Sequence, residues 1–292
     1  MTEPITIEAH ESYVLGLKFT ADSETLISCG MDNVVKLWSV GSWEHVRTLE
    51  GHTHSVHTMA LSPDEKTLVT GSSDKTVKLW SFPQGKELQT LQDRKQVVSA
   101  VRISADGEWF AAASYGGRAM VWTIAGNPVV GVKANKNNLS SVDFSPDRTI
   151  LATCGLGDDI YLWHLPSGES AGQLTGHKTA VMNIKFVENG RYLMSFGYEQ
   201  TIKFWDTETW EVARVVRPIV PSSRGIAFSD DEQLAAVLLE GRVDIMSVKD
   251  WIQQGELAFT AKSVGSAAFS QDGRWLAVGA ADRKIRIWSM PI

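Results

Sequence analysis

Three groups of side chains in this sequence contain a hydroxyl, an imidazole and a carboxylate, which are the parts of a nucleophilic hydrolase. Each group ends in a tryptophan, and the spacing is the same in all three. The groups are His10, Ser28, Asp32 and Trp38; His52, Thr70, Asp74 and Trp80; and His177, Ser195, Glu199 and Trp205. A catalytic site occurs once, whereas this pattern recurs. We therefore interpret these residues as scaffold, expect no catalytic residue, and predict that the protein is not an enzyme.

The sequence has no pattern typical of a metal or cofactor site. The seven histidines show no HxxxH spacing, and the two cysteines are not paired as ligands. His52, His54 and His57 lie close together, but His52 belongs to a recurring group, which leaves at most two ligands. A phosphate loop of the GxxxxGK[ST] form is absent. We therefore expect neither a metal nor a cofactor.

A repeat that fills the chain must position these groups. Related segments such as GMDNVVKLW, GSSDKTVKLW and GAADRKIRIW recur at intervals of 41 or 42 residues. The segments end at Trp38, Trp80, Trp122, Trp163, Trp205, Met246 and Trp288. Seven such repeats account for all 292 residues, so we expect a single domain over residues 1–292.

Each repeat has the pattern of four short strands. Stretches such as TVKLW and KIRIW alternate and contain β-branched residues, while SPDEK, SADGE, SPDRT and SQDGR indicate turns. In the second repeat the expected strands are Val56–Leu61, Thr67–Ser72, Val77–Ser81 and Glu87–Leu91. A repeat of paired helices is excluded because Gly, Ser, Pro and Asp interrupt every run of helical periodicity. One four-stranded sheet cannot bury both of its apolar faces, so the repeats must stack.

At these residues the sequence resembles the WD-repeat (WD40) family. Trp205–Asp206 is the literal Trp-Asp pair. Gly51–His52 and Gly176–His177 are Gly-His pairs, Ala9–His10 is a variant, and each histidine precedes its tryptophan by 28 residues. The resemblance implies an all-β fold, a seven-bladed β-propeller with four antiparallel strands per blade. It also implies that the recurring tryptophan, hydroxyl, imidazole and carboxylate form a structural chain of hydrogen bonds.

The ends of the chain predict how the ring closes. The sequence stops after the third strand of the seventh repeat, IRIWSMPI, and it begins with ITIE in the place of a fourth strand. We expect the segment from about Pro4 to Glu8 to pair with the last blade, which closes the ring and leaves no free edge. The chain would then be a complete propeller. Repeats 3, 4 and 6 lack both the histidine and the acidic turn residue, and repeat 7 keeps only Asp282 and Trp288.

Composition favours a soluble cytoplasmic protein. The net charge of −6 and the absence of any Lys/Arg block longer than two residues argue against nucleic acid as a partner. Cys29 and Cys154 are too few for a disulfide scaffold, so we expect two reduced core thiols. The longest apolar stretch, Leu234–Leu239, is too short to cross a bilayer, and the N-terminus lacks the pattern of a secretory signal.

The resemblance implies that a partner binds on the narrow face of the propeller, at three positions per blade. Carried over onto this sequence, the partner-binding candidates are Tyr13, Leu15, Met31, His57, Tyr115, Leu156, Met182, Tyr198, Arg224 and Leu239. Tyr, Met and Arg are enriched in interfaces, so we expect a scaffold or adaptor that holds a protein or peptide there. Tyr115 and Tyr198 are the strongest candidates. The alternative is that the apolar members fill the top of the axial channel.

The sequence also allows alternative interpretations of three tryptophans and of the protein's function. Trp43, Trp210 and Trp251 each follow the repeat's Trp or Met position by five residues, and they either cover a blade edge or form a second docking surface. The protein could be a structural subunit that uses both faces of the propeller. A small-ligand binder or an enzyme at the axial channel is a further alternative, which would require a carboxylate pair or a metal cluster that the sequence does not show.

Overall fold

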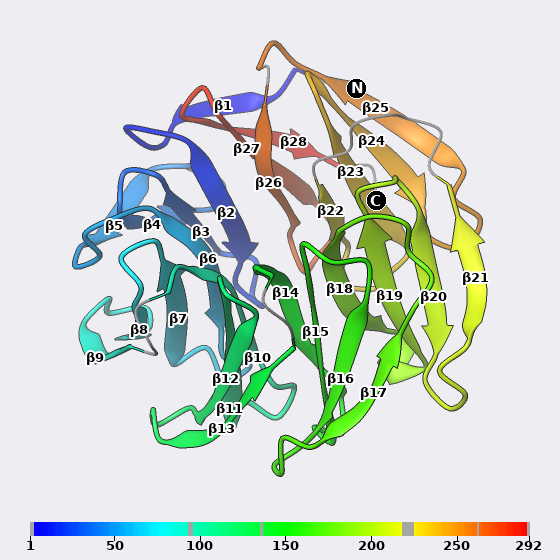
Figure 1. The fold of residues 1–292 in the computed structure, drawn as a ribbon. Helices are drawn as coiled ribbons and strands as arrows, with labels where there is room; N and C mark the ends of the chain where they lie inside the picture. The colour runs from blue at the N-terminus through cyan, green and yellow to red at the C-terminus, as the bar shows by residue number, and fades with distance from the viewer. Residues whose placement is uncertain (1–2, 93–95, 135–136, 218–224, 262, 291–292) are drawn as a thin grey trace. The chain divides into compact units, whose positions relative to one another are not determined.

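The protein is described by a computed structural model over residues 3–92, 96–134, 137–217, 225–261 and 263–290, where it forms seven four-stranded antiparallel sheets and one 3-10 helix (Figure 1). These sheets confirm the predicted fold class, an all-β, seven-bladed β-propeller with four antiparallel strands per blade. We number them as blades 1 to 7 in the order of the seven repeats. The chain divides into two compact units, residues 1–57 with 220–292 and residues 58–219.

The first compact unit contains blades 1, 6 and 7. Blade 1 consists of β2 (Val14–Phe19), β3 (Thr25–Gly30), β4 (Val35–Ser39) and β5 (His45–Leu49). Blade 6 consists of β22 (Gly225–Phe228), β23 (Leu234–Leu239), β24 (Arg242–Ser247) and β25 (Gln253–Ala258). Blade 7 consists of β26 (Val264–Phe269), β27 (Trp275–Ala280), β28 (Lys284–Ser289) and the N-terminal strand β1 (Ile5–Glu8).

The second compact unit contains blades 2 to 5, and the division falls within β6. Blade 2 consists of β6 (Val56–Leu61), β7 (Thr67–Ser72), β8 (Val77–Ser81) and β9 (Glu87–Leu91), which are the four ranges that the sequence predicts. Blade 3 consists of β10 (Val98–Ile103), β11 (Trp109–Ser114), β12 (Arg118–Thr123) and β13 (Pro128–Lys133). Blade 4 consists of β14 (Leu139–Phe144), β15 (Ile150–Gly155), β16 (Ile160–His164) and β17 (Ser170–Leu174). Blade 5 consists of β18 (Val181–Val187), the 3-10 helix η1 (Glu188–Gly190), β19 (Tyr192–Gly197), β20 (Ile202–Asp206) and β21 (Val212–Val216).

The N-terminal strand completes the last blade, as predicted. β1 pairs antiparallel with β28, with Ile5 opposite Ile287 and Glu8 opposite Lys284 (Figure 1). The Lys284 ammonium lies 2.6 Å from the Glu8 carboxylate across this pair. Ile7 of β1 packs against a cluster of buried residues from blades 7 and 1. The edge of β28 is therefore covered by backbone hydrogen bonds and by a partly buried isoleucine.

The core lies between the faces of consecutive blades, because each sheet is apolar on both sides. In the second unit, one buried cluster joins blades 2 and 3, another joins blades 3 and 4, and a third joins blades 4 and 5. In the first unit, buried clusters join blades 6 and 7 and blades 7 and 1. Cys29 and Cys154 are free and fully buried, and burial raises the pKa of each thiol to about 12. They are core residues, as predicted.

The turn between the first and second strands is held by one side-chain hydrogen bond in six blades. A Ser or Thr hydroxyl donates to the Asp two residues later over 2.6 Å in every case, from Thr20 to Asp22 in blade 1 and from Ser145 to Asp147 in blade 4, for example. In blade 5 the helix η1 takes the place of this turn. The sequence SPDEK and its relatives thus specify a rigid turn, which fixes where the second strand begins.

The tryptophans that follow the third strands are packed against blades. Trp43 is 6% exposed and makes an edge-to-face contact with Trp275 of blade 7, with ring centroids 5.3 Å apart. Trp251 is also buried, and Trp210 is half-buried against a cluster of residues from blades 4 and 5. All three adopt a left-handed backbone with φ of 58–59°, at a turn position where Gly85 and Gly168 stand in blades 2 and 4. Of the two sequence-based alternatives, covering a blade edge fits this burial, and a second docking surface does not.

Candidate functional site

The first recurring group forms an unbroken hydrogen-bonded chain. The Trp38 indole N–H donates to the Ser28 hydroxyl over 2.9 Å, and that hydroxyl lies 2.7 Å from His10 Nε2. The other ring nitrogen, Nδ1, lies 2.8 Å from Asp32 Oδ1. Indole can only donate, so the Ser28 proton points to Nε2 and the Nδ1 proton points to the carboxylate. Burial by itself would raise the pKa of Asp32, but the hydrogen bonds from His10 and from the Glu11 backbone N–H, together with the nearby Lys36 ammonium, help to lower it below its ordinary value.

The same chain recurs in blade 5. Trp205 donates to Ser195 over 2.9 Å, Ser195 lies 2.7 Å from His177 Nε2, and His177 Nδ1 lies 2.5 Å from Glu199. The longer Glu199 side chain also accepts from the hydroxyls of Thr179 and Thr201. Burial would raise the pKa of Glu199, yet these hydrogen bonds hold it at about 2. Burial lowers the pKa of His177, so the pair consists of a neutral imidazole and an ionised carboxylate.

These groups are structural parts of the blades. The Ser28 and Ser195 side chains are completely buried, so no substrate can reach either hydroxyl. In blade 2, Trp80 donates to Thr70 over 2.9 Å and Thr76 donates to Asp74 over 2.6 Å, and His52 is buried. Within the described part of the chain, no three His, Cys, Asp or Glu side chains gather in a way that could hold a metal ion.

Two kinds of hydrogen bond in this network were not predicted from the sequence. In blade 4, Trp163 donates to Thr153 over 3.0 Å, so this blade keeps the tryptophan–hydroxyl half of the chain although it lacks the histidine. The lysine two residues before the tryptophan also takes part in two blades. Lys36 donates to the carbonyl of Ala9 over 2.7 Å, and Lys203 donates to that of Gly176. Each carbonyl belongs to the residue directly before the network histidine. The constant spacing of Ser or Thr, Lys and Trp in the sequence could have predicted the Thr153–Trp163 hydrogen bond and the two lysine contacts.

Acid should weaken blade 5 in two steps. The pKa of His177 is lowered below its ordinary 6.5, so stability begins to fall as the pH drops below 6.5. The pKa of Glu199 is held at about 2 against an ordinary 4.5, so its contribution is complete above pH 4.5 and is lost as the pH falls towards 2. We expect Glu199→Gln to lower the free energy of unfolding at pH 7 and to flatten its decline between pH 4.5 and 2. Denaturant titrations at several pH values measure this, with the exposed Glu208→Gln as control. An equal decline in both variants would contradict the assignment.

In blades 1, 3, 4 and 5, the residue after the second strand and the residue before the first strand are joined by a backbone hydrogen bond. The backbone N–H of Tyr115 donates to Val97 O over 3.0 Å, that of Leu156 to Asn138 O over 2.9 Å, and that of Tyr198 to Ala180 O over 2.8 Å. In blade 1, Met31 N–H donates to Tyr13 O over 2.9 Å. The residue after the second strand therefore lies beside the residue before the first strand in these four blades. At Gly155 a Cβ atom would lie 2.0 Å from Asn138 O, so only glycine permits this close approach.

In the second unit, hydrogen bonds connect the segments that carry these positions from blade to blade. Gly116 N–H, next to Tyr115, donates to the Asn138 side chain of blade 4 over 3.0 Å. Gly157 O, next to Leu156, accepts from Val181 N–H of blade 5 over 3.0 Å. Val181 precedes Met182 in β18. Hydrogen bonds thus link the backbone segments that carry Tyr115, Leu156, Met182 and Tyr198 across blades 3, 4 and 5, and we call these four residues the blade 3–5 row.

The four side chains of the row are exposed, whereas the exposure of the remaining partner-binding candidates varies. Exposure is 40% for Tyr115, 57% for Leu156, 37% for Met182 and 72% for Tyr198, and in the first unit it is 44% for Tyr13 and 41% for Met31. Leu15 and His57 are half-buried, and burial lowers the pKa of His57. Arg224 lies outside the described residues.

The expectation that Leu239 is exposed is wrong. Its side chain is only 3% exposed. The turn after β23 in blade 6 has two residues, Glu240 and Gly241, so Leu239 pairs with Arg242 inside the sheet instead of standing beyond it. The shortened turn removes the exposed position that blades 1, 3, 4 and 5 have.

The comparison with known protein families agrees with this architecture. The family described as WD domain, G-beta repeat (WD40) matches residues 2–39, 43–81, 85–123, 126–164, 168–206 and 251–289. The chain belongs to the WD40 family. The stretch between the last two matches, 207–250, covers most of blade 6, where Met246 stands in place of tryptophan. The structure shows that this divergent WD40 repeat still forms a four-stranded blade.

Several curated WD40 relatives resemble part of the chain. It is 27% identical to pre-mRNA-processing factor 19 of Oryza sativa subsp. japonica over 54% of its own length and 31% of that protein. It is 26% identical to telomerase protein component 1 of Rattus norvegicus, over 55% of this chain and 6% of that protein. It is 24% identical to the WD repeat-containing protein WDS homolog of Arabidopsis thaliana, over 62% and 36%. The matches thus span about a third of these relatives or less.

The described residues contain no helix that is long and apolar enough to span a membrane.

Proposed function

We propose that this WD40 protein is a non-enzymatic interaction scaffold that holds a protein or peptide on the blade 3–5 row. The observation that carries the proposal is the row itself. Two tyrosines, a leucine and a methionine, 37–72% exposed, stand on connected backbone of three consecutive blades. Exposed apolar side chains that gather on one surface usually mark a contact site, and Tyr and Met are enriched in interface cores.

Exposure also argues against the alternative that these side chains fill a channel. A side chain that plugs a channel is enclosed on most sides, whereas Tyr198 is 72% exposed and Leu156 is 57% exposed. Tyrosine adds a hydroxyl that suits a contact with both apolar and wet parts. Tyr198 and Leu156 are therefore the residues that we expect to contribute most to binding.

The proposal includes the organisation and setting of the molecule. We propose that the seven blades act as one domain and that the protein works inside the cell. Two of the relatives are named for pre-mRNA processing and for telomerase, and these names do not favour the narrower expectation of a cytoplasmic location. The net charge of −6 still favours a protein as the direct partner over a nucleic acid.

A matched pair of leucines tests the row. Leu156 on the row and Leu88 on the outer strand β9 are 57% and 56% exposed, so a charge at either should affect folding alike. We expect Leu156→Asp to weaken binding of a purified partner at least about 30-fold, the effect of losing an interface hot spot of about 2 kcal/mol. Leu88→Asp should leave binding unchanged.

The partner is first identified by affinity purification from the native source, with an RNase-treated arm, and is then titrated against each variant by calorimetry. Full affinity of Leu156→Asp and of a Tyr115→Ala, Tyr198→Ala double variant would refute the row as the site. Loss of capture after RNase treatment would show that RNA bridges the contact.

A further inference from the structure

Asn138 connects two parts of the blade 3–5 row. Its side-chain Oδ1 atom accepts the backbone N–H of Gly116, next to Tyr115 in blade 3, over 3.0 Å. Its backbone carbonyl accepts the N–H of Leu156 in blade 4 over 2.9 Å. Gly155 permits this approach, because a Cβ atom there would lie 2.0 Å from the same carbonyl. Asn138 is therefore held between the segments that carry Tyr115 and Leu156.

The hydrogen bond to Gly116 fixes which way the Asn138 carboxamide faces. A backbone N–H can only donate, so the oxygen faces Gly116 and the NH2 group faces away from it. No acceptor for this NH2 group is found among the described residues. Asn138 is half-buried, so a partner that covers the row also covers this unpaired donor. A buried donor without an acceptor costs free energy, and the partner must therefore supply an acceptor here.

The charges of the adjacent turn favour an uncharged acceptor. Asp158 and Asp159 follow Leu156 in the turn between β15 and β16, and Asp158 is exposed. Burial and the charge of Asp158 raise the pKa of Asp159, so further negative charge is disfavoured beside this turn. A partner's carboxylate would be repelled here, whereas a neutral carbonyl oxygen would not.

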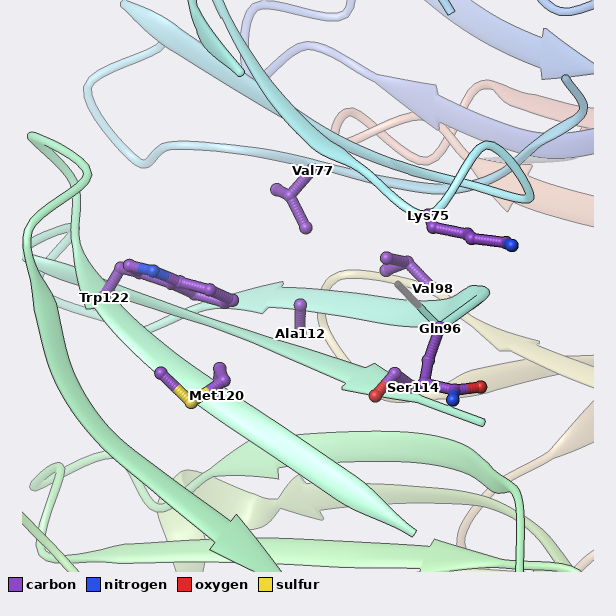
Figure 2. A pocket seen from close by; sticks show the side chains of 8 residues that line it. All are labelled: Lys75, Val77, Gln96, Val98, Ala112, Ser114, Met120 and Trp122. Carbon is purple, nitrogen blue, oxygen red and sulfur yellow. The ribbon is translucent and has the colours of Figure 1, made fainter. Parts of the chain in front are cut away.

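The hollow between blades 2 and 3, next to Tyr115, offers no alternative binding place. Gln96, Ser114 and Trp122 are among the side chains that line it, and Ser114 directly precedes Tyr115 (Figure 2). It has room for about one water molecule, so a partner side chain does not fit. The groups that select a partner are therefore those on the surface of the row.

We propose that the row binds an extended segment of a partner chain. One main-chain carbonyl of this segment accepts a hydrogen bond from the Asn138 NH2 group, and apolar side chains on either side of that carbonyl contact Tyr115 and Leu156. Asn138 thus recognises the backbone of the partner, and the exposed residues of the row recognise its side chains. The inference rests on the proposed function, because it states the form of the partner that the row holds.

An extended segment fits this donor better than a helix or a sheet does. Carbonyls inside a helix or a sheet are already paired with backbone N–H groups, whereas those of an extended segment on a surface are free. Such a segment advances by about 3.3 Å per residue, so each carbonyl has a side chain on either side. Val97 and Ala180 hold the equivalent positions in blades 3 and 5 and have no polar side chain, so this contact is specific to blade 4 of the row.

Asn138→Asp separates recognition from positioning. An ionised aspartate keeps an oxygen that accepts the Gly116 N–H but has no N–H to donate. Hydrogen exchange should show that the Gly116 amide stays protected, while the partner isolated by affinity purification should bind at least about tenfold more weakly in calorimetry. Asn137→Asp is the matched control, because it adds the same charge one residue away and should leave the affinity unchanged. Full affinity in Asn138→Asp, or equal losses in both variants, overturns the inference.

The unaltered protein gives a second readout that does not depend on the folding of a variant. In a 15N-labelled sample, the side-chain NH2 resonances of Asn138, assigned as the pair that Asn138→Asp lacks, should shift when the partner is added. Resonances that stay in place at saturating partner overturn the inference.

Alanine substitutions of the polar side chains in the partner's bound segment test the acceptor. None should remove the difference in affinity between the unaltered protein and Asn138→Asp, because a main-chain carbonyl remains in every variant. A substitution that removes it would identify a side chain as the acceptor and overturn the main-chain assignment. Full partner affinity in Leu156→Asp refutes the row itself, whereas weakened binding there with full affinity in Asn138→Asp refutes only this inference.

Discussion

A chain that lacks residues 1–8 should lose about 3–6 kcal/mol of unfolding free energy. The loss combines the backbone hydrogen bonds between β1 and β28, each worth about 0.5–1.5 kcal/mol, with the partial burial of Ile7. Typical domains have a total of about 5–15 kcal/mol, so this single strand carries a large share. Denaturant unfolding followed by circular dichroism measures the change.

Hydrogen exchange locates the effect within the blade. Removal of β1 should speed the exchange of the β28 amides, while the amides of β12 in blade 3 should keep their protection. Ile7→Ala and Thr6→Ala separate side-chain packing from pairing, because Ile7 is half-buried and Thr6 is exposed. An unchanged free energy of unfolding, together with unchanged exchange in β28, would refute the role of the N-terminal strand.

Trp205→Ala should cost about 3–5 kcal/mol, because truncation of a buried tryptophan leaves a large cavity. The substitution also removes the donor that orients the Ser195 hydroxyl towards His177, so the hydrogen-bonded chain of blade 5 loses its first member. Thermal and denaturant unfolding give the magnitude.

Phenylalanine separates the hydrogen bond from the packing. Trp205→Phe removes the N–H bonded to Ser195, whereas Trp122→Phe in blade 3 removes an indole without a hydroxyl ten residues before it. We expect the blade 5 variant to be more destabilised, by about 1 kcal/mol, the net value of one buried hydrogen bond. Equal costs would show that the tryptophans act through packing alone.

The repeat made most of the fold predictable. Constant spacing of the tryptophans fixed the number of blades, and the Ser-x-Asp segments placed the turns closely enough that the four strands of blade 2 match their predicted ranges. The N-terminal pairing was also predictable, because ITIE occupies the position of a fourth strand. Local pattern and strand order agree throughout, which is the condition for such a prediction to succeed.

The features that the sequence interpretation missed depend on single residues within the repeat. The expected exposure of Leu239 is wrong because a turn shorter by one or two residues moves that position into the sheet. The Thr153–Trp163 hydrogen bond depends on the hydroxyl ten residues before the tryptophan and not on the histidine, so the histidine pattern does not predict it. The blade 3–5 row itself stays a prediction as a binding site.

The antiparallel register of β1 and β28 has a mechanical consequence. Ile5 at the start of β1 lies opposite Ile287 near the end of β28. The N-terminal end of β1 and the C-terminal end of β28 are therefore at the same end of the strand pair. A force that pulls these ends apart loads the hydrogen bonds one after another, from Ile5 towards Glu8, and not all at once in shear. The pairing of β1 with β28 should therefore open bond by bond at low tension when the two chain ends are pulled apart.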